Sequence, residues 1–269
     1  MDEDARYAIE RAKWDAHAHH TVEAQALGPK DLVPEDTTFA SYAADHLSMA
    51  GMAGFLGDLH GKRVLEYGCG LGRLTVVLAR SGAKVTAFDL SEASIKATRE
   101  RLEFNGLADR VELVVASGEH LPFPDGSFDV AVGKAVLHHL DPSAGSRELA
   151  RVLVPGGRAS FSEPLGTNPL VVFAREHLPY PGKHERGADV PLTRDDIRTW
   201  MAPFAAGKLR PIQLTAMVER AFGFDTTFPV LRRLDDVILR TVPGAWRLCR
   251  YGILYLTASA TDEPASQQA

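Results

Sequence analysis

The chain has 269 residues, of which 45% are hydrophobic and 24% charged, and its formal net charge is -5. This is the composition of a globular protein long enough for one α/β domain, alone or with an insert. The sequence contains no run of lysine and arginine, so nucleic acid is not expected as a partner. It contains no run of about 18 apolar residues, so no transmembrane segment is expected.

The cysteines and the N-terminal residues bear on the cellular compartment. Cys69 and Cys249 lie far apart and form neither a disulfide framework nor a zinc-binding pattern, and no metal site is predicted. The first residues, MDEDARYAIERAK, are charged and lack the apolar core of a signal peptide. We therefore expect a protein of the reducing cytoplasm.

Short apolar runs alternate with helical patterns along residues 61–163. A helix closed by Gly82 is expected over 71–82, and another begins at Asp141, with Pro142 in its first turn. Strands are predicted by five apolar runs, at 62–68, 83–91, 110–117, 128–136 and 158–164. This alternation predicts βαβ units, and hence an α/β fold with a doubly wound, mostly parallel sheet.

The stretches on either side of this core have different patterns. Residues 1–60 predict helices and loops that form an N-terminal lid. Residues 164–218, rich in proline, glycine and charge with short helical pieces such as TRDDIRTWM, predict a capping insert over the strand ends. Residues 261–269 are expected to be disordered.

Residues 219–260 are amphipathic and end in a further predicted strand at 252–259. We expect them to complete the sheet and to contribute an apolar acceptor pocket. A dimer face or a contact with a membrane surface is the alternative, and core packing is the simplest interpretation. The apolar residues in question are Leu231, Leu234, Val237, Ile238 and Trp246.

Three glycines in five positions follow the first predicted strand, in VLEYGCGLGRLT. Glycine loses more backbone entropy on folding than any other residue, so Gly68, Gly70 and Gly72 indicate a close approach to a ligand, or a tight turn with none. Ligands bind at the carboxyl ends of strands in such a sheet, which makes 61–163 the predicted cofactor-binding core. No Lys-Ser or Lys-Thr pair follows Gly72, and the G-x-G-x-G spacing departs from the dinucleotide pattern G-x-G-x-x-G.

Two carboxylates indicate what the glycine turn binds. Glu66, two residues before the turn, would repel a pyrophosphate and attract a cation. Asp89, at the end of the second strand, can accept both hydroxyls of a ribose; the alternative is a charge at the start of the next helix, which Ser91 can cap. A nucleoside with a positively charged tail suits both residues, and S-adenosylmethionine is such a molecule.

The sequence resembles the class I S-adenosylmethionine-dependent methyltransferases, in particular the small-molecule branch of ubiquinone/menaquinone-type and natural-product enzymes. The resemblance covers roughly residues 40–163, and four motifs occur in the family's order. They are VLEYGCGLG, FDLS, ASGEHLPFPDGSFDVAV, and VLHHLDP followed by RELARVLVPGGR. The resemblance implies a seven-stranded Rossmann-like sheet with helices on both faces, S-adenosylmethionine as cofactor and S-adenosylhomocysteine as product.

The resemblance also implies roles for single residues. Ser117 stands where the family often has aspartate. A serine hydroxyl is a weaker acceptor for the adenine amino group than an aspartate carboxylate. Tyr67 replaces a smaller aliphatic residue, and it either packs or narrows the site with its hydroxyl; Cys69 in the same turn is counted with the binding residues as a small apolar side chain. The other implied positions are Glu66, Gly68, Gly70 and Lys134 along the methionine part, Asp89 at the ribose, and Leu90, Gly118 and Glu119 around the adenine.

Candidate catalytic residues follow the fourth and fifth strands. Neutral imidazole is the usual general base near pH 7, and His138 and His139 come directly after the fourth strand. The resemblance implies that the His138 side chain faces the acceptor, while His139 packs or orients the loop. The alternative is a structural role for both histidines. Glu163, at the end of the fifth strand, either contacts the acceptor, pairs with a histidine or caps the insert.

Further side chains are candidates for covering the site. We expect Trp14 and Tyr42 to close over the cofactor. The cluster of His17, His19 and His20 lacks further ligands at metal-binding spacing and suits the face of a lid. In the insert, a charged group can line an acceptor pocket or stay exposed: Arg175, His177, His184, Glu185 and Arg186.

These features predict an in-line SN2 methyl transfer to an oxygen or carbon atom of a small, hydrophobic metabolite. The acceptor is the expected partner, and a homo-oligomer is left open. Two alternatives remain. One is a non-catalytic S-adenosylmethionine-binding scaffold or regulatory protein. The other is a dehydrogenase, against which the missing third glycine and the segment LPFPDGSFD argue.

Overall fold

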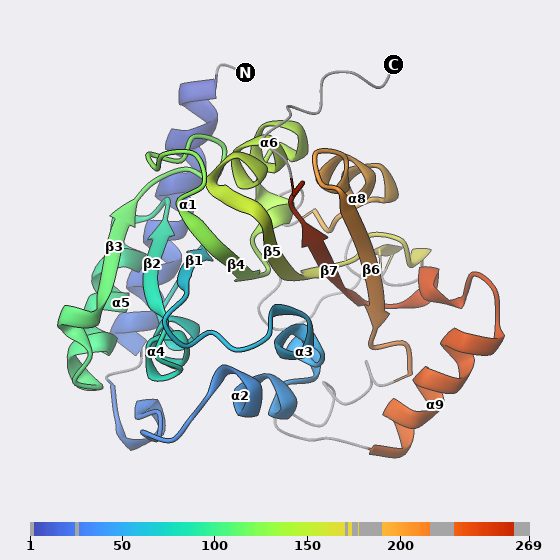
Figure 1. Cartoon of the computed structure of the whole chain (residues 1–269), viewed down its shortest axis with the longest axis horizontal. Helices are drawn as coiled ribbons and strands as arrows, with labels where there is room; N and C mark the ends of the chain where they lie inside the picture. The colour runs from blue at the N-terminus through green and yellow to red at the C-terminus, as the bar shows by residue number, and fades with distance from the viewer. Residues whose placement is uncertain are drawn as a thin grey trace.

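A computed structural model describes residues 3–24, 27–169, 172–173, 177, 190–215 and 229–260 (Figure 1). A seven-stranded sheet in the order β3-β2-β1-β4-β5-β7-β6 forms its centre. The strands are β1 Arg63–Tyr67, β2 Lys84–Asp89, β3 Val111–Val115, β4 Phe128–Lys134, β5 Leu153–Pro164, β6 Ala206–Ile212 and β7 Tyr251–Thr257. All neighbouring pairs from β3 across to β5 are parallel, and β7 is antiparallel to both β5 and β6. The predicted mostly parallel, doubly wound α/β sheet is confirmed.

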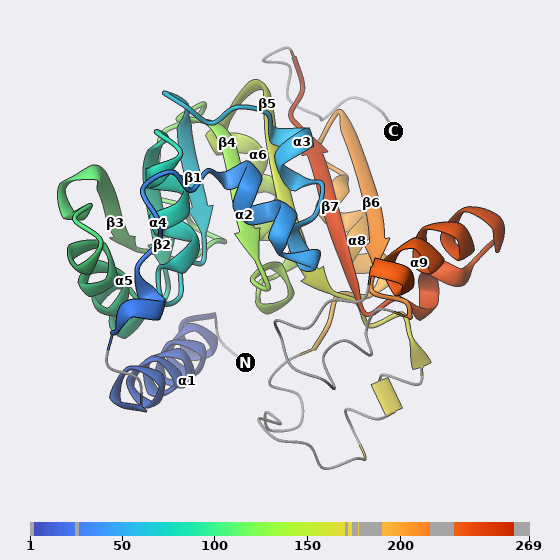
Figure 2. The same cartoon turned by 90° about the horizontal axis from the view of Figure 1, so that it is seen from below.

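Helices cover both faces of the sheet. Figure 2 shows α2 and α3 on one side of the sheet and α6 and α8 on the other. The first face is packed by α2 to α5, and the second by α6 and α8. The helices are α1 Glu3–Ala24, α2 Phe39–Asp45, α3 Met52–Leu56, α4 Arg73–Arg80, α5 Glu92–Phe104, α6 Pro142–Val152, α8 Arg194–Met201 and α9 Pro229–Thr241.

The central strands are apolar on both sides because both sides are covered. In β1, Val64 packs into the core beneath α4 and Leu65 into the core beneath α6, and both are fully buried. Strands buried on both faces read as continuous apolar runs, which is why the sequence identified them. The predicted Ser91 cap forms, since its hydroxyl accepts from Ser94 N. A helix also begins after Asp141, as predicted, and the structure adds that the Asp141 carboxylate caps it by accepting from Ala144 N.

Strand β6 was missed by the sequence analysis, which placed 206–212 inside the insert. Its segment, AGKLRPI, contains a proline and is mostly exposed, because it lies at the edge of the sheet and pairs with β7 alone. Such a strand shows no clear apolar alternation. The helix before it, α8, does form where TRDDIRTWM predicted one, and its Trp200 is buried in the core.

Helix α9 buries only part of its apolar surface. Ile238 packs against the core, whereas Leu234 and Val237 are 43% and 58% exposed, so core packing does not account for all of them. Among the described helices, none is both long enough and apolar enough to cross a membrane. The expected disordered tail at 261–269 and most of the charged group in the insert lie outside the described residues.

Candidate active site

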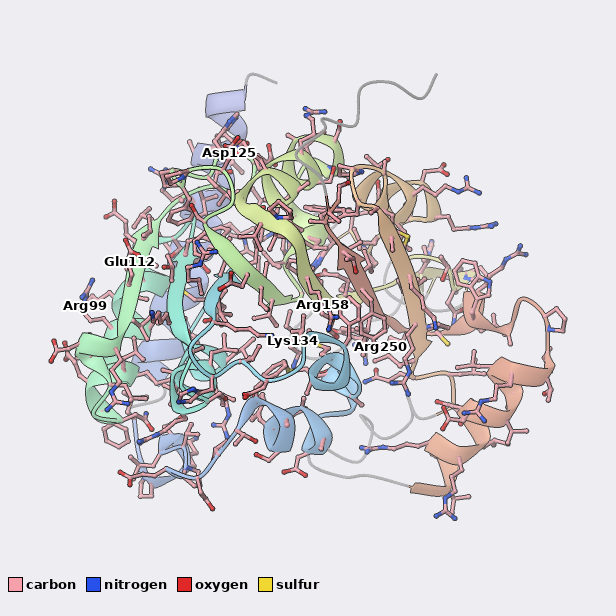
Figure 3. The ribbon with its side chains drawn as sticks, in the orientation of Figure 1. Arg99, Glu112, Asp125, Lys134, Arg158 and Arg250 are labelled. Atoms are coloured by element: carbon pink, nitrogen blue, oxygen red, sulfur yellow. The ribbon has the colours of Figure 1, made fainter. Side chains whose placement is uncertain are left out.

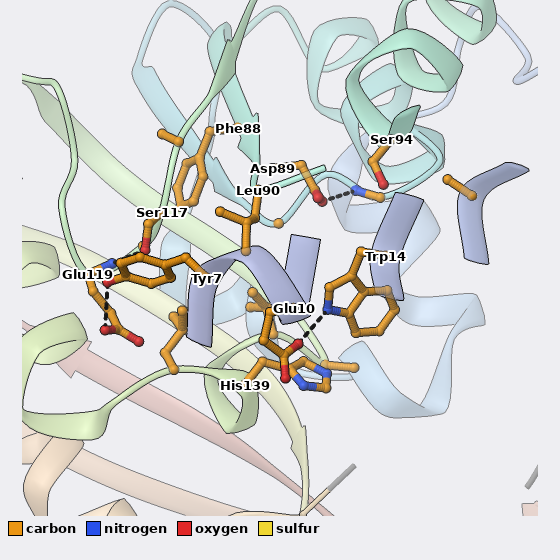
Figure 4. A pocket seen from close by; sticks show the side chains of 18 of the residues that line it. Tyr7, Glu10, Trp14, Phe88, Asp89, Leu90, Ser94, Ser117, Glu119 and His139 are labelled. Carbon is orange, nitrogen blue, oxygen red and sulfur yellow. Dashed lines mark hydrogen bonds between the residues drawn. The ribbon is translucent and has the colours of Figure 1, made fainter. Parts of the chain in front are cut away.

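A cavity of about 320 Å³ lies at the carboxyl ends of the strands, beneath α1 (Figure 4). Its walls come from the segments that follow β1 to β4, and α1 contributes Tyr7, Glu10 and Trp14. The order of the strands reverses between β1 and β4, and this switch point is where open α/β sheets bind ligands. The volume lies at the lower end of the range for small-molecule sites.

The three glycines of the turn have separate structural reasons. All have positive φ angles, 70° at Gly68, 52° at Gly70 and 78° at Gly72, which other residues rarely adopt. A Cβ atom at Gly68 would lie 2.7 Å from the Val136 side chain, and one at Gly72 would lie 2.9 Å from the Thr98 backbone. A Cβ at Gly70 would meet nothing within 4 Å. Gly70 lines the cavity, and no other atom of the described part of the chain lies close to the side of its backbone where a Cβ would stand.

Asp89 holds the turn and faces the cavity at the same time. One carboxylate oxygen accepts from Gly70 N at 2.9 Å, and the other accepts from Ser91 N at 3.0 Å. Burial raises the pKa of Asp89, and the two backbone N–H groups oppose this effect. A carboxylate has about four lone-pair sites, so these bonds leave acceptor capacity for ligand hydroxyls.

The segment after β3 forms the wall beyond Asp89. Ala116, Ser117, Gly118 and Glu119 all line the cavity. The Glu119 carboxylate accepts from the Tyr7 hydroxyl of α1 at 2.8 Å and from the backbone N of the residue that caps α6, Asp141, at 2.7 Å. The segment is thus tied both to α1 and to the start of α6.

Helix α1 forms a further wall of the cavity. The Trp14 indole donates to Glu10 at 3.1 Å and lies edge-on to His139, with ring centroids 4.9 Å apart (Figure 4). Asp15 accepts from the Ser91 hydroxyl, which joins α1 to α5. Trp14 therefore lines the cavity, and its closure over the cofactor stays a prediction. Tyr42 does not line the cavity and instead stacks on His46.

Glu163 organises the loop after β4. One of its carboxylate oxygens accepts from Val136 N at 2.9 Å and from Leu137 N at 3.1 Å, and the other lies 2.7 Å from His138 Nδ1. The side chains of His138 and Glu163 are 3% and 0% exposed. Ala135, just before this loop, has φ of 54°, a strained value for a residue with a Cβ.

The two histidines are arranged opposite to the orientation that the sequence favoured. His139 lines the cavity, and His138 turns away to Glu163. Both are held by the short loop, with ring centroids 3.9 Å apart. Pairing with a histidine was one of the three roles considered for Glu163, and the structure has this pairing.

The other expected binding residues divide into two groups. Glu66, Tyr67 and Cys69 are buried and are not among the residues that line the cavity. The remaining ones do line it: Gly68, Gly70, Asp89, Leu90, Ser117, Gly118, Glu119 and Lys134. Lys134 lies near the centre of the molecule in Figure 3, at the end of β4. The side chains of His17, His19 and His20 are outside the described part of the structure.

Glu66 lies in the core beside the glycine turn. Its Oε2 atom is buried and has no hydrogen-bond partner among the described residues. Burial raises the pKa of Glu66 to about 8, and the nearby Asp89 carboxylate adds to the effect. Glu66 is therefore mostly protonated at neutral pH in this structure, and it does not present the negative charge to the cavity that the sequence led us to expect.

Several cavity residues were missed by sequence reasoning. Tyr7, Glu10 and Trp14 follow one another on α1 at spacings of three and then four residues, which places all three on one helical face. That spacing was available in the sequence. Phe88 and Ser94 also line the cavity, and nothing in the sequence separated them from ordinary core residues.

The chemistry of the cavity fits a nucleoside with a positive tail. Three carboxylates line the described cavity, those of Glu10, Asp89 and Glu119, against a single ammonium group at Lys134. The apolar side chains of Phe88 and Leu90 offer surfaces for a planar base. No group of three or more His, Cys, Asp or Glu side chains placed to hold a metal ion occurs among the described residues.

Comparisons with known proteins agree with this chemistry. The family model for a methyltransferase domain matches residues 65–161. A demethylmenaquinone methyltransferase of Clavibacter sepedonicus is 38% identical over 139 residues, which cover 51% of this chain and 55% of the relative. The ubiquinone/menaquinone biosynthesis C-methyltransferase UbiE of Hahella chejuensis is 37% identical over 60% of this chain and 66% of the relative. In both cases the chain spans less than two thirds of the relative's length.

Solved structures share the fold at lower identity. The [4+2]-cyclase SpnF superimposes with a TM-score of 0.59 at 18% identity, covering 93% of this chain and 96% of that one. Geranyl diphosphate C-methyltransferase from Streptomyces coelicolor gives a TM-score of 0.57 at 14% identity, covering 95% of this chain and 98% of that one. At these identities the likeness concerns the fold alone.

Proposed function

The core of this chain belongs to the class I S-adenosylmethionine-dependent methyltransferases, and we propose that the protein transfers a methyl group from S-adenosylmethionine to a small, hydrophobic metabolite. The observation that carries the proposal is the position of Asp89, whose carboxylate stands in the cavity beside the glycine turn. A quinone-type acceptor is the class that the names of these curated relatives support.

The cofactor roles follow from the walls of the cavity. Asp89 binds the two ribose hydroxyls, because its oxygens keep acceptor capacity beside the bonds from Gly70 and Ser91. The backbone of Gly68 and Gly70 lies along the methionine part, with Lys134 at the same end. Leu90 packs on the adenine, and the segment 117–119 borders its edge.

The chemistry places modest demands on the protein. The sulfonium of the bound cofactor supplies a methyl group that is already electrophilic. The chain aligns the acceptor with the methyl carbon and sulfur and excludes water, and α1 with Trp14 serves the second purpose. The carbon–sulfur bond breaks as the bond to the acceptor forms.

A proton must leave the acceptor when the acceptor atom is a hydroxyl oxygen. His139 is the residue that we propose to take it, because His139 lines the cavity and His138 is engaged by Glu163. Glu163 then acts as a positioning residue, since it fixes the loop that carries both histidines. An activated carbon acceptor, as in a phenol or enol, needs this base less.

A second candidate function is a scaffold that binds the cofactor without transferring its methyl group. The specific observation in its favour is that a structural neighbour with nearly full coverage is described as a cyclase. Because the fold does not fix the function, the scaffold is retained as the second candidate, behind methyl transfer.

The experiment for the proposed function separates the two candidates. The purified protein is incubated with methyl-labelled S-adenosylmethionine and a panel of quinols, phenols, enols and terpenoid acceptors. We expect label in at least one acceptor, with S-adenosylhomocysteine formed in equal amount, and a loss of about 100-fold in rate in His139→Ala for an oxygen acceptor. Tight cofactor binding without label in any acceptor would favour the scaffold.

A further inference from the structure

Tyr67 is a large polar side chain buried behind the cavity. It ends β1 and is 0% exposed, and it is not one of the cavity's lining residues. Its ring lies edge-on to Phe88, with centroids 4.6 Å apart, and to Phe161, at 5.6 Å. The ring therefore fills the core between β1 and its neighbours. The hydroxyl needs a separate explanation.

The Tyr67 hydroxyl reaches across the core to the wall of the cavity. It donates a hydrogen bond of 2.5 Å to the carbonyl oxygen of Gly118. Gly118 is buried, so this carbonyl has little access to water. The contact is also steric, because a Cβ atom at Gly118 would lie 2.5 Å from the Tyr67 ring. Both the position and the orientation of the Gly118 peptide thus depend on Tyr67.

The Gly118 peptide lies at the centre of a tight turn. His120 N donates to Ser117 O at 3.1 Å, and Glu119 N donates to the Ser117 hydroxyl at 3.2 Å. The turn presents the polar atoms of Ser117 and Glu119 to the cavity. The bonds that Glu119 makes to α1 and to the start of α6 hold one end of the turn, and Tyr67 holds its middle from behind.

We propose that the buried Tyr67 hydroxyl is a positioning residue for base recognition: through Gly118 it holds the 117–119 turn where the turn distinguishes adenine from other purines. This inference rests on the proposed cofactor. The Ser117 hydroxyl is the proposed acceptor for the adenine amino group, and it is a weaker acceptor than a carboxylate. A carboxylate at this position would still hold the amino group if the turn were slightly displaced. A weak acceptor must be placed accurately to discriminate, because a hydrogen bond weakens steeply with poor geometry. A tyrosine at position 67 provides that placement from the first strand.

The test compares two ligands that differ only in the base edge. S-adenosylhomocysteine and S-inosylhomocysteine, in which a carbonyl replaces the 6-amino group, are titrated calorimetrically into wild type and Tyr67→Phe. We expect wild type to prefer the adenine ligand. Tyr67→Phe should weaken that ligand about tenfold and the inosine ligand about twofold, so that the preference narrows about fivefold.

Ser160→Ala is the matched control. Its hydroxyl is also buried and also donates to a backbone carbonyl, that of Leu254, at 3.1 Å, but the bond lies between β5 and β7. This variant should keep the wild-type preference. Gly118→Ala, which pushes the turn off the Tyr67 ring, should narrow the preference as Tyr67→Phe does.

A ligand-free measurement complements the titrations. Hydrogen exchange of the amides of residues 117–120 should accelerate in Tyr67→Phe and not in Ser160→Ala. Equal weakening of both ligands in Tyr67→Phe, no weakening, or no preference in wild type would each overturn the inference and leave the proposed cofactor intact. Failure of wild type to bind either ligand, with the protein folded, would instead remove the proposed cofactor, and the inference with it.

Discussion

His138 Nδ1 lies 2.7 Å from one oxygen of Glu163, while the other oxygen of that carboxylate accepts the backbone N–H groups of Val136 and Leu137. A single buried carboxylate thus fixes both the backbone of the loop after β4 and one of its histidines. The adjacent His139 is directed into the cavity as a result.

Loss of this carboxylate is expected to destabilise the protein. Glu163→Ala leaves two backbone donors and a histidine nitrogen without their acceptor, and each such buried group costs about 1–3 kcal/mol. We expect a loss of about 3 kcal/mol in the free energy of unfolding, measured by urea denaturation. Ser162→Ala is the neighbouring control, because the Ser162 hydroxyl is buried without a partner among the described residues. Equal stability in the two variants would contradict the role given to Glu163.

The two histidines should differ in chemical reactivity. Treatment with diethyl pyrocarbonate, followed by peptide mass spectrometry, should modify His139, which lines the cavity, and spare His138, whose side chain is 3% exposed. S-adenosylhomocysteine should protect His139, since the ligand fills the same cavity. Modification of His138 in preference to His139 would show that the loop has another arrangement in solution.

Helix α1 should contribute to cofactor affinity. Trp14→Ala removes part of the cavity wall and returns ligand surface to water, so the Kd for S-adenosylhomocysteine should rise about tenfold. Ile9→Ala, on the same helix, removes a side chain that is 59% exposed and should leave the Kd unchanged. Calorimetry on both variants checks this, and similar affinities would mean that α1 does not cover the bound ligand.

Glu66 predicts a pH dependence of stability. Its pKa is about 8 in the folded protein against 4.5 as the ordinary value, so between these limits the folded state binds the proton and the unfolded state releases it. Stability from this group is therefore complete below about pH 4.5 and is lost as the pH rises through about 8. The glutamine side chain in Glu66→Gln does not titrate, so this variant lacks the pH dependence that Glu66 gives to the wild type.

The variant should consequently gain stability relative to wild type as the pH rises. We expect a difference of about 4 kcal/mol in the free energy of unfolding at pH 8, and of less than about 1 kcal/mol at pH 5. Urea denaturation at the two pH values measures it. Glu103→Gln, at an exposed glutamate of α5, serves as control. Parallel pH profiles for wild type and Glu66→Gln would show that Glu66 is ionised in the folded protein.

Much of the fold could be predicted because the signals were local. Strands such as β1 and β4 are buried on both faces, so their sequences are continuous apolar runs between glycines and caps. The edge strand β6 could not be found in this way, because its side chains are mostly exposed and its pairing with β7 is a long-range contact.

The candidate site was predictable where backbone chemistry dictated the residue. Gly70 and Asp89 were found because a positive φ and a strand-end carboxylate leave clear patterns. The orientation of adjacent side chains leaves no such pattern. Which of His138 and His139 faces the cavity depends on Glu163, which lies 25 positions further along the chain from His138.

The most direct test of the account is calorimetric titration of S-adenosylmethionine and S-adenosylhomocysteine into wild type, Asp89→Ala and Asp129→Asn. Asp129 is a matched carboxylate that pairs with Arg63 at the start of β1, away from the cavity. We predict micromolar binding to wild type and to Asp129→Asn, and affinity at least about 100-fold weaker in Asp89→Ala, because the ribose loses two hydrogen bonds to a charged acceptor. Equal affinity in Asp89→Ala, or no binding to folded wild type, would contradict the account.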